Sequence, residues 1–245
     1  MSAPDLVVLG SAGSYQTVGS PGSGYVVRVA GTTIVLDLGP GTFGALLGTV
    51  PIHAVDAVVV THGHADHASD LLAWFHAARH GIVPRSAVPL FAPKDVLERV
   101  GGFLRKGPAE LAVVFESRAV GESASVVGVR LSFVAADHGV PAVSVRVEGG
   151  GTSVVYSGDT APNDRLVSLA SDADLFLCEA SVVQGPVAGH CGADEAGAMA
   201  DRAGARRLVL THLREDVDAD EAVAAAGEAF DGPVEVAEAG RTLSI

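Results

Sequence analysis

The sequence predicts an α/β or α+β sandwich, in which helices cover mixed β-sheets. Strand-like and helix-like hydrophobic patterns alternate along the whole chain, without a low-complexity tract or a long linker. Apolar residues make up 48% of the chain and charged residues 18%, which is typical of a folded protein with a large core. The 30 glycines indicate many tight turns. We therefore expect a single domain over residues 1–245.

The expected strands are short apolar runs, mostly bounded by turn residues: Leu6–Leu9, Tyr25–Val29, Thr33–Leu38, Ala57–Val60, Val113–Phe115, Val129–Ala135, Ala142–Val147, Ser153–Tyr156, Leu175–Cys178 and Leu208–Leu210. The expected helices show helical hydrophobic periodicity: Gly44–Leu47, Ala68–His80, Lys94–Val100, Asp164–Leu169, Ala193–Ala203 and Asp220–Ala229. Glycines predict hairpin turns at Ala30–Thr32 and Gly149–Gly151. These patterns fix the fold class but not the topology.

Charge and composition exclude several kinds of partner. The formal net charge is −13, from 16 basic and 29 acidic residues, so the surface repels long nucleic acids, whereas small phosphorylated or carboxylated molecules fit better. No apolar stretch is long enough for a membrane span, and the opening segment from Met1 to Gly10 lacks the pattern of a signal peptide. We expect a cytoplasmic protein in which Cys178 and Cys191 are reduced thiols. A homodimer is the commonest assembly for such a chain.

The strongest chemical signal is the segment Thr61–His67, which contains His62, His64, Asp66 and His67. It directly follows the expected strand Ala57–Val60 and precedes an expected helix. On extended backbone His62 and His64 point to the same side, and Asp66 and His67 enter the helix start from another angle. Imidazole and carboxylate groups at this spacing suit Zn²⁺ or a similar metal. The alternative is a solvated helix N-terminus that happens to be rich in histidine.

This motif resembles the signature of the metallo-β-lactamase superfamily, which includes ribonuclease Z, glyoxalase II and several phosphodiesterases. Three later segments, each ending a strand-like run, resemble the family in the same order: Leu131–His138, Tyr156–Thr160 and Leu210–Leu213. The resemblance implies a four-layer αββα sandwich of two mixed β-sheets flanked by helices.

The resemblance also implies a ligand set for two divalent metal ions. Carried over by position, the first ion is held by His62, His64 and His138, the second by Asp66, His67 and His212, with Asp159 between the two. Zinc is the first choice, and Mn or Fe are alternatives with the same ligands. A hydroxide bound by two such ions attacks phosphoryl or carbonyl groups at neutral pH. Asp66 is also expected to orient that hydroxide.

Two further segments, Leu177–Ser181 and His190–Ala196, resemble stretches of ribonuclease Z in which a histidine beside the metals donates to the substrate or to the leaving oxygen. Here that histidine is His190, and Glu179 is expected to orient it. A carboxylate partner fixes the imidazole tautomer and raises its pKa, which suits a general acid. The alternative is that His190 is an unpartnered residue at a helix start.

Three other features have weaker signals. Asp37 matches a family position near the metals, where we expect it to hydrogen-bond a ligand histidine. The Gly/Ser-rich loop with Ser11, Gly13 and Ser14 is a candidate phosphate contact, although such loops are common between strands. The basic residues Arg99, Arg105 and Lys106 lie in a Gly-rich stretch, which we interpret as a solvated loop rather than as a cap over the site.

The differences between this sequence and the larger family members reduce the number of possible substrates. Between His138 and Asp159 there is room for a hairpin, but not for the long tRNA-binding arm of ribonuclease Z. The segment after His212 is too short for the substrate domain of glyoxalase II. The sequence most resembles short cyclic-nucleotide phosphodiesterases, which implies that metal-bound hydroxide attacks a small-molecule phosphodiester. The alternatives are hydrolysis of a carboxylic ester, thioester or lactone, a ribonuclease acting on RNA ends, and a non-catalytic metal or nucleotide sensor.

Overall fold

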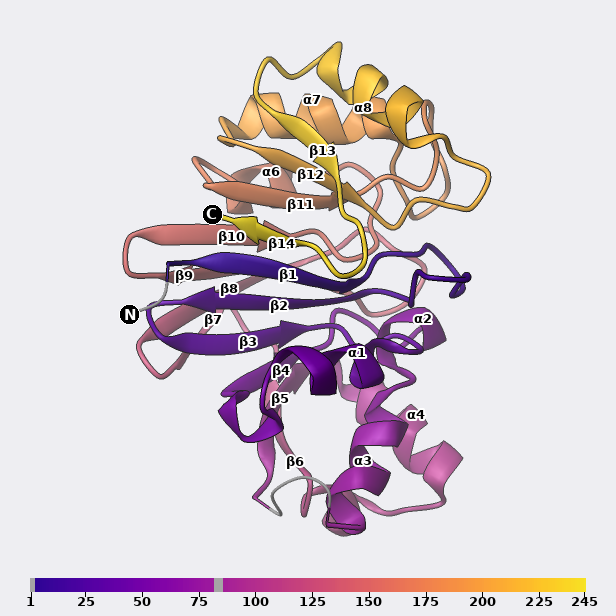
Figure 1. Cartoon of the computed structure of the whole chain (residues 1–245), viewed down its shortest axis with the longest axis vertical. Coiled ribbons are helices and arrows are strands. Elements are labelled where there is room, and N and C mark those ends of the chain that lie inside the picture. Colours follow the sequence, from indigo (N-terminus) through magenta and orange to yellow (C-terminus); the bar gives the residue numbers. More distant parts are fainter. Residues whose placement is uncertain (1–2, 82–85) are drawn as a thin grey trace.

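The computed structural model describes residues 3–81 and 86–245, so Met1 and Ser2 of the opening segment lie outside the described residues. In this part of the chain two seven-stranded sheets pack face to face, and helices cover the outer face of each sheet (Figure 1). This arrangement confirms the four-layer αββα sandwich that the sequence resemblance implied.

The two sheets share one pattern of pairing: three antiparallel pairs followed by three parallel pairs. The first sheet has the order β14 (Thr242–Ser244), β1 (Asp5–Gly10), β2 (Gly24–Val29), β3 (Thr32–Leu36), β4 (Ala57–Val59), β5 (Val88–Ala92) and β6 (Phe115–Ala119). The second has the order β7 (Ser123–Val126), β8 (Val129–Ala135), β9 (Val143–Gly149), β10 (Thr152–Tyr156), β11 (Leu175–Glu179), β12 (Leu208–Thr211) and β13 (Val234–Val236).

The central strands of the two sheets, such as β4, β11 and β12, are buried on both faces, because each sheet lies between the other sheet and a helical layer. The helices are α1 (Thr42–Thr49), the 3₁₀ turn η1 (Ile52–Ala54), α2 (Ala65–Ala68), α3 (Leu71–Arg79), α4 (Lys94–Leu104), α5 (Pro108–Leu111), α6 (Asp164–Leu169), α7 (Ala193–Ala203) and α8 (Ala219–Gly227). Side chains of α1, α3 and α4 pack on the first sheet, and those of α6, α7 and α8 on the second. A third cluster, with Tyr25 and Tyr156 in edge contact, fills the space between the sheets.

Both expected hairpin turns are confirmed as tight two-residue turns. Val29 pairs with Thr32 around Ala30 and Gly31, and Gly149 pairs with Thr152 around two further glycines. All four turn residues have positive φ, which is the conformation of the type I′ turns that match the twist of paired strands.

Two expected elements differ from the structure, and strand β5 was not expected. The expected strand at Val113–Phe115 begins instead at Phe115, and β5 was missed because Pro89 interrupts its apolar run. The expected helix Ala68–His80 is divided into α2 and α3. The division lies at Asp70, whose backbone N–H donates to Leu38 O rather than to a carbonyl of its own helix.

The strand ends determine where functional side chains gather. Strands β3, β4, β10, β11 and β12 run parallel within their sheets, so their carboxyl ends meet at one edge of the sandwich. Ligands of α/β proteins bind at this kind of edge.

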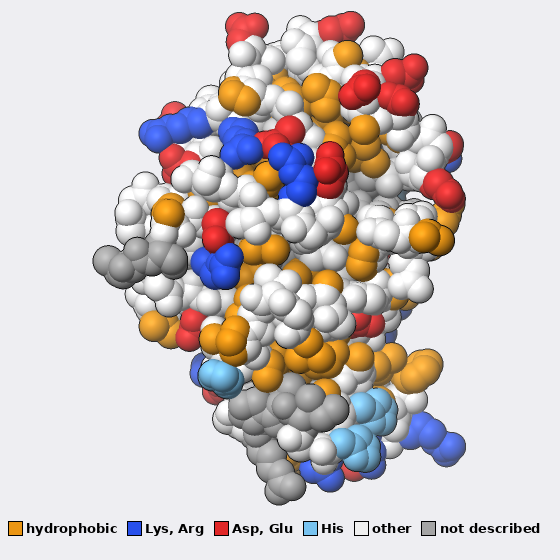
Figure 2. Space-filling view, in the orientation of Figure 1, with side chains coloured by type: hydrophobic (Ala, Val, Ile, Leu, Met, Phe, Trp, Pro, Cys, Tyr) orange, Lys and Arg blue, Asp and Glu red, His pale blue; other side chains and the backbone are white. Residues whose placement is uncertain are grey.

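On the face in Figure 2, acidic side chains gather over the α7–α8 end. Within the described residues, the structure has no helix with the length and apolarity needed to cross a membrane.

Candidate dinuclear metal site

Four strand ends place the predicted ligands at this edge. His62 to His67 follow β4 and form the start of α2, His138 follows β8, Asp159 follows β10 and His212 follows β12. Their potential ligand atoms form two groups, in each of which all the atoms lie within 4.8 Å of one another. Asp159 belongs to both groups. The structure therefore brings together all seven side chains predicted as ligands.

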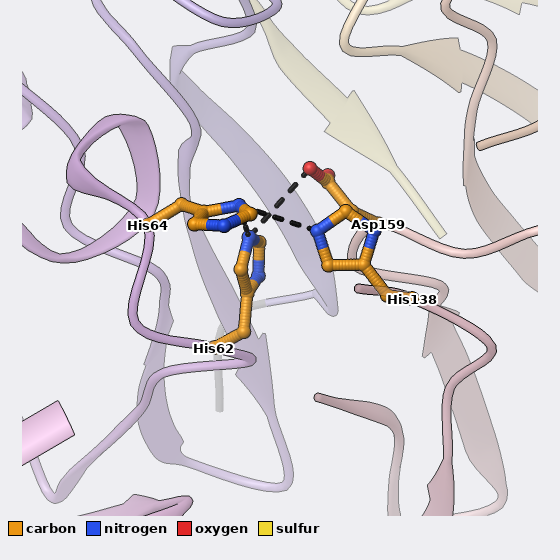
Figure 3. A group of neighbouring side chains, drawn as sticks. All are labelled: His62, His64, His138 and Asp159. Carbon is orange, nitrogen blue, oxygen red and sulfur yellow. Dashed lines mark hydrogen bonds and ion pairs between the residues drawn. The ribbon is translucent and has the colours of Figure 1, made fainter. Parts of the chain in front are cut away.

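The first group consists of His62, His64, His138 and Asp159, whose side chains converge on one point (Figure 3). His64 Nδ1 lies 3.1 Å from His62 Nε2 and 3.2 Å from His138 Nε2. Asp159 Oδ2 lies 3.6 Å from His62 Nε2. Ligands about 2.0–2.1 Å from a tetrahedral zinc ion are roughly 3.4 Å apart, so these separations fit a zinc-sized ion.

The second group consists of Asp66, His67, His212 and Asp159. Asp159 Oδ1 lies 3.1 Å from His67 Nε2 and 3.6 Å from His212 Nε2. Asp66 Oδ2 lies 3.2 Å from His212 Nε2. The two carboxylate oxygens of Asp159 thus face different groups, which is the geometry of a bridging ligand.

Unpaired polar atoms support a cation at this position. Among the described residues, His67 Nε2 and Asp159 Oδ1 are buried and have no hydrogen-bond partner of good geometry. Buried polar atoms are rarely left unsatisfied, because each costs about 1–3 kcal/mol. Both atoms belong to the group of Asp66, His67, His212 and Asp159, and a metal ion held by this group would satisfy both, so the residues present fit the cofactor.

In three of the ligand histidines the other ring nitrogen is held away from the site by an outer partner. Nδ1 of His62 contacts Thr61 Oγ1 at 3.1 Å, and Nδ1 of His138 lies 2.7 Å from Gly189 O. Nδ1 of His67 lies 2.8 Å from Asp37 Oδ2. In each case Nε2 faces the cluster, as in metal sites whose histidines are oriented by an outer partner.

Burial and charge divide the histidines into two kinds. Burial and the neighbouring His67 lower the pKa of His62 to about 2. Burial also opposes charge on His67 and His212, yet the carboxylate of Asp159 raises the pKa of both, with Asp37 assisting at His67 and Asp66 at His212. A raised pKa favours the protonated form, so the nearby carboxylates favour protons on His67 and His212 when no cation is bound.

This balance predicts that metal binding releases protons. His67 and His212 must be neutral to act as ligands, so a metal competes with protons for both. We expect apparent zinc affinity to rise as pH rises, with at least one proton released per chain near neutral pH. Calorimetry of zinc binding in buffers of different ionisation enthalpy measures the release. An affinity that is independent of pH would contradict this prediction.

Asp37 lies beneath the site, at the contact expected from the sequence. It is fully buried, and its carboxylate accepts hydrogen bonds from the Thr61 backbone N–H at 2.7 Å, the Thr61 hydroxyl at 2.9 Å and the Tyr156 hydroxyl at 2.8 Å, besides its contact with His67. These partners come from both halves of the sandwich. The backbone of Asp37 has φ 57°, in the left-handed region that residues other than glycine rarely adopt, and the surrounding hydrogen bonds hold it there.

We expect Asp37→Asn to weaken both the fold and the metal site. The amide nitrogen of asparagine cannot accept the bonds that the carboxylate oxygens accept, and each orphaned buried donor costs about 1–3 kcal/mol. Loss of the His67 partner is expected to reduce metal affinity about 10–100-fold. Urea unfolding and zinc titration measure the two effects. The matched control is Asp164→Asn at the start of α6: its side chain is 87% exposed and its ion pair with Arg202 lies at the surface, so both values should change little.

Glu179 and His190 form a pair beside the two groups, where the sequence predicted it. His190 Nδ1 lies 3.1 Å from Glu179 Oε2 and 3.9 Å from Asp159 Oδ2. Glu179 is fully buried, whereas the His190 side chain is 23% exposed. The hydrogen bond to Glu179 raises the pKa of His190 and outweighs the effect of burial. With Nδ1 engaged, Nε2 is the ring nitrogen left to meet a substrate.

No role was predicted from the sequence for Ser181, which links this pair to the ligand His212. The Ser181 hydroxyl donates to Glu179 Oε2 at 2.8 Å and lies 3.4 Å from His212 Nδ1. The Thr160 backbone N–H donates to Glu179 Oε1 at 2.6 Å. A hydroxyl residue two positions after Glu179 at a strand end was the available signal.

The Ser11–Ser14 loop borders the site, but most of its donors are engaged. The Ser11 hydroxyl donates to Ala237 O at 2.7 Å, and the Gly13 N–H donates to Leu213 O at 3.1 Å. The Ser14 N–H faces His212 Nε2 at 3.4 Å. Phosphate contact therefore stays a prediction, and Ser14 is its best-placed donor.

The fold and the two His/Asp groups define a protein of the metallo-β-lactamase fold with a divalent metal site. The family model described as the beta-lactamase superfamily domain matches residues 32–213, and the chain belongs to this family. An uncharacterized protein of Mycobacterium leprae is 34% identical over 251 residues, covering 98% of this chain and 88% of the relative. Ribonuclease Z of Kineococcus radiotolerans is 30% identical over 266 residues, covering 87% and 84%. The crystal structure of the metallo-β-lactamase fold protein YhfI from Bacillus subtilis has a TM-score of 0.88 at 25% identity, covering 99% of both chains.

Proposed function

We propose that this protein is a dinuclear metal-dependent phosphodiesterase that hydrolyses a small phosphodiester, with a cyclic nucleotide as the best single candidate. The observation that carries the proposal is the Glu179–His190 pair beside the bridging carboxylate of Asp159. A partly exposed imidazole with a raised pKa is suited to protonate a leaving oxygen.

The metal ligands in this proposal are the two groups around Asp159. His62, His64 and His138 would hold one ion, and Asp66, His67 and His212 the other. Zinc is the proposed metal, because the groups combine nitrogen and oxygen donors at zinc-like separations. When bound, two such ions supply an activated water and neutralise the charge that develops on the attacked group.

The protein residues would position the reactants and move one proton. Asp66, the most exposed carboxylate of the ligand set at 12%, would orient the attacking water. His190 would hold a proton at Nε2 and donate it to the oxygen that leaves phosphorus. Glu179 would keep His190 in that orientation, and Ser181 and Thr160 would fix Glu179.

Two features favour a small phosphodiester over a long RNA, and one relative supports phosphodiester chemistry as such. The interval between His138 and Asp159 forms the short hairpin β9–β10, which offers no arm for a large substrate. The net charge of −13 disfavours polyanions. The ribonuclease Z relative acts, by its name, on a nucleic acid, so phosphodiester cleavage is a chemistry found among named members of the family.

A substrate panel with zinc- or manganese-loaded protein tests the proposal. It contains cyclic AMP, cyclic GMP, bis(p-nitrophenyl) phosphate, a short RNA with a 3′ extension, a thioester and a lactone. Cleavage of the small phosphodiesters is the expected result. Turnover of the carbonyl substrates alone would replace the proposal with an esterase or lactonase, and RNA trimming alone would favour the ribonuclease alternative. Tight nucleotide binding without turnover would favour a sensor.

A further inference from the structure

A groove opens directly beside the metal site, between α2–α3 and α4. Its volume is about 360 Å³, and His64 forms part of its wall. The rest of the wall is mostly apolar and includes Leu72, Val100 and Phe103. Pockets that bury small organic ligands have volumes of roughly 300–1,000 Å³ and the same mainly apolar lining. The groove is therefore large enough for the organic part of a substrate whose reacting group lies at the metals.

Helix α4 presents one face to this groove. Val96 and Val100 are buried under it, and Arg99 and Phe103 follow at helical spacing on the same side. The Phe103 side chain is 77% exposed, although it is large and apolar. An aromatic ring exposed at the rim of a pocket beside reactive groups has a free face for stacking.

Arg99 brings a fixed positive charge to the same wall. Its Nε donates to Asp95 Oδ2 at 3.0 Å, and no hydrogen bond joins its terminal nitrogens to another described residue. Gly63, between His62 and His64, makes this approach possible, because a Cβ at Gly63 would lie 2.9 Å from Arg99 Cδ. The guanidinium thus lies against the metal motif, where it can donate to acceptors on a bound ligand.

We propose that this groove is the base-binding subsite, in which the base of a cyclic nucleotide stacks on Phe103 and its polar edge receives hydrogen bonds from Arg99. The inference rests on the proposed function and deepens it by naming the residues that select the substrate. An apolar wall, an exposed ring and a guanidinium together match a flat, aromatic ligand with acceptors on its edge. A short aliphatic ester would use neither the ring nor the guanidinium.

Paired substrates separate base recognition from catalysis. One is the cyclic nucleotide, and the other is the methyl riboside 3′,5′-cyclic phosphate, which keeps the reacting group and lacks the base. For Phe103→Ala we expect KM for the cyclic nucleotide to rise about 5- to 150-fold, the range for loss of one base–aromatic stack, with kcat nearly unchanged. KM for the riboside should not change, so the discrimination between the two substrates falls by the same factor. Arg99→Ala should act in the same direction.

Two controls accompany these variants. Phe103→Leu keeps an apolar side chain but removes the ring, so it should behave like Phe103→Ala. Leu47→Ala removes another exposed apolar side chain, on α1 and away from the groove, and should leave both substrates unaffected. Because Phe103 is largely exposed, its removal should not change the melting temperature.

The outcomes distinguish this inference from the proposed function. If Phe103→Ala changes both substrates equally, or neither, the subsite is wrong while the phosphodiesterase stands. If the wild-type protein cleaves no phosphodiester, the proposed function fails, and calorimetry with a 5′-nucleotide then decides the subsite. Nucleotide binding that weakens in Phe103→Ala would sustain a base-binding groove; binding that is absent or unchanged would overturn it.

Discussion

Asp159→Asn is expected to lower phosphodiester turnover by about 10³-fold and to reduce metal content from two ions per chain to one or fewer. Asp159 directs one oxygen to each ligand group, 3.6 Å from His62 Nε2 and 3.1 Å from His67 Nε2. The neutral amide has the same shape, but it offers one good ligand atom instead of two and removes a negative charge. Metal clamping contributes several kcal/mol to such reactions, and each ~1.4 kcal/mol is tenfold in rate.

The measurement combines metal analysis of dialysed protein with steady-state kinetics. Asp216→Asn is the matched control, because Asp216 lies close to His212 in sequence but its side chain is 69% exposed. It should retain both ions and full turnover. The idea that Asp159 bridges two ions would be wrong if the Asp159→Asn protein kept two tightly bound ions and wild-type activity.

Most residues of the metal site could be predicted from short local sequence motifs. His62 to His67 are contiguous, and the other ligands each follow an apolar strand-like run, so strand ends alone place them at one edge. The tight turn at Ala30–Gly31 was predictable for a similar reason, since its chemistry is local. What these positions share is that a few neighbouring residues determine the conformation.

The structural features that the sequence analysis did not predict depend on contacts between segments that are distant in the sequence. The break between α2 and α3 occurs because Asp70 bonds to Leu38, which lies far from it in the sequence. Strand β5 contains Pro89 and is recognisable once β4 and β6 pair with it on either side. The interpretation of Arg99 as part of a loop is wrong, because Arg99 lies on α4, but its side chain is 53% exposed and so is solvated as expected. The close approach of α4 to Gly63 was not predictable, because it is a feature of tertiary packing.

Removal of the Glu179–His190 pair is the second large effect. We expect His190→Ala to reduce hydrolysis of a cyclic nucleotide by about 10²–10⁴-fold, the usual contribution of a general acid. The ribose oxygen is a poor leaving group and needs the proton. A p-nitrophenyl phosphodiester has a leaving group that departs without protonation, so its hydrolysis should fall far less. Equal losses on both substrates would mean that His190 binds phosphate and does not donate the proton.

Glu179→Gln tests the same pair through its pH dependence. A general acid works in its protonated form, so activity is lost as pH rises through the pKa of His190. The hydrogen bond from Glu179 raises that pKa and extends activity to higher pH. Replacement of the carboxylate removes this effect, and the descending limb of the kcat/KM profile should move to lower pH at unchanged metal content. Glu179 accepts hydrogen bonds from Ser181 and Thr160, which hold it within hydrogen-bonding distance of His190 Nδ1. A limb that stays in place would therefore show that a group other than His190 carries the proton.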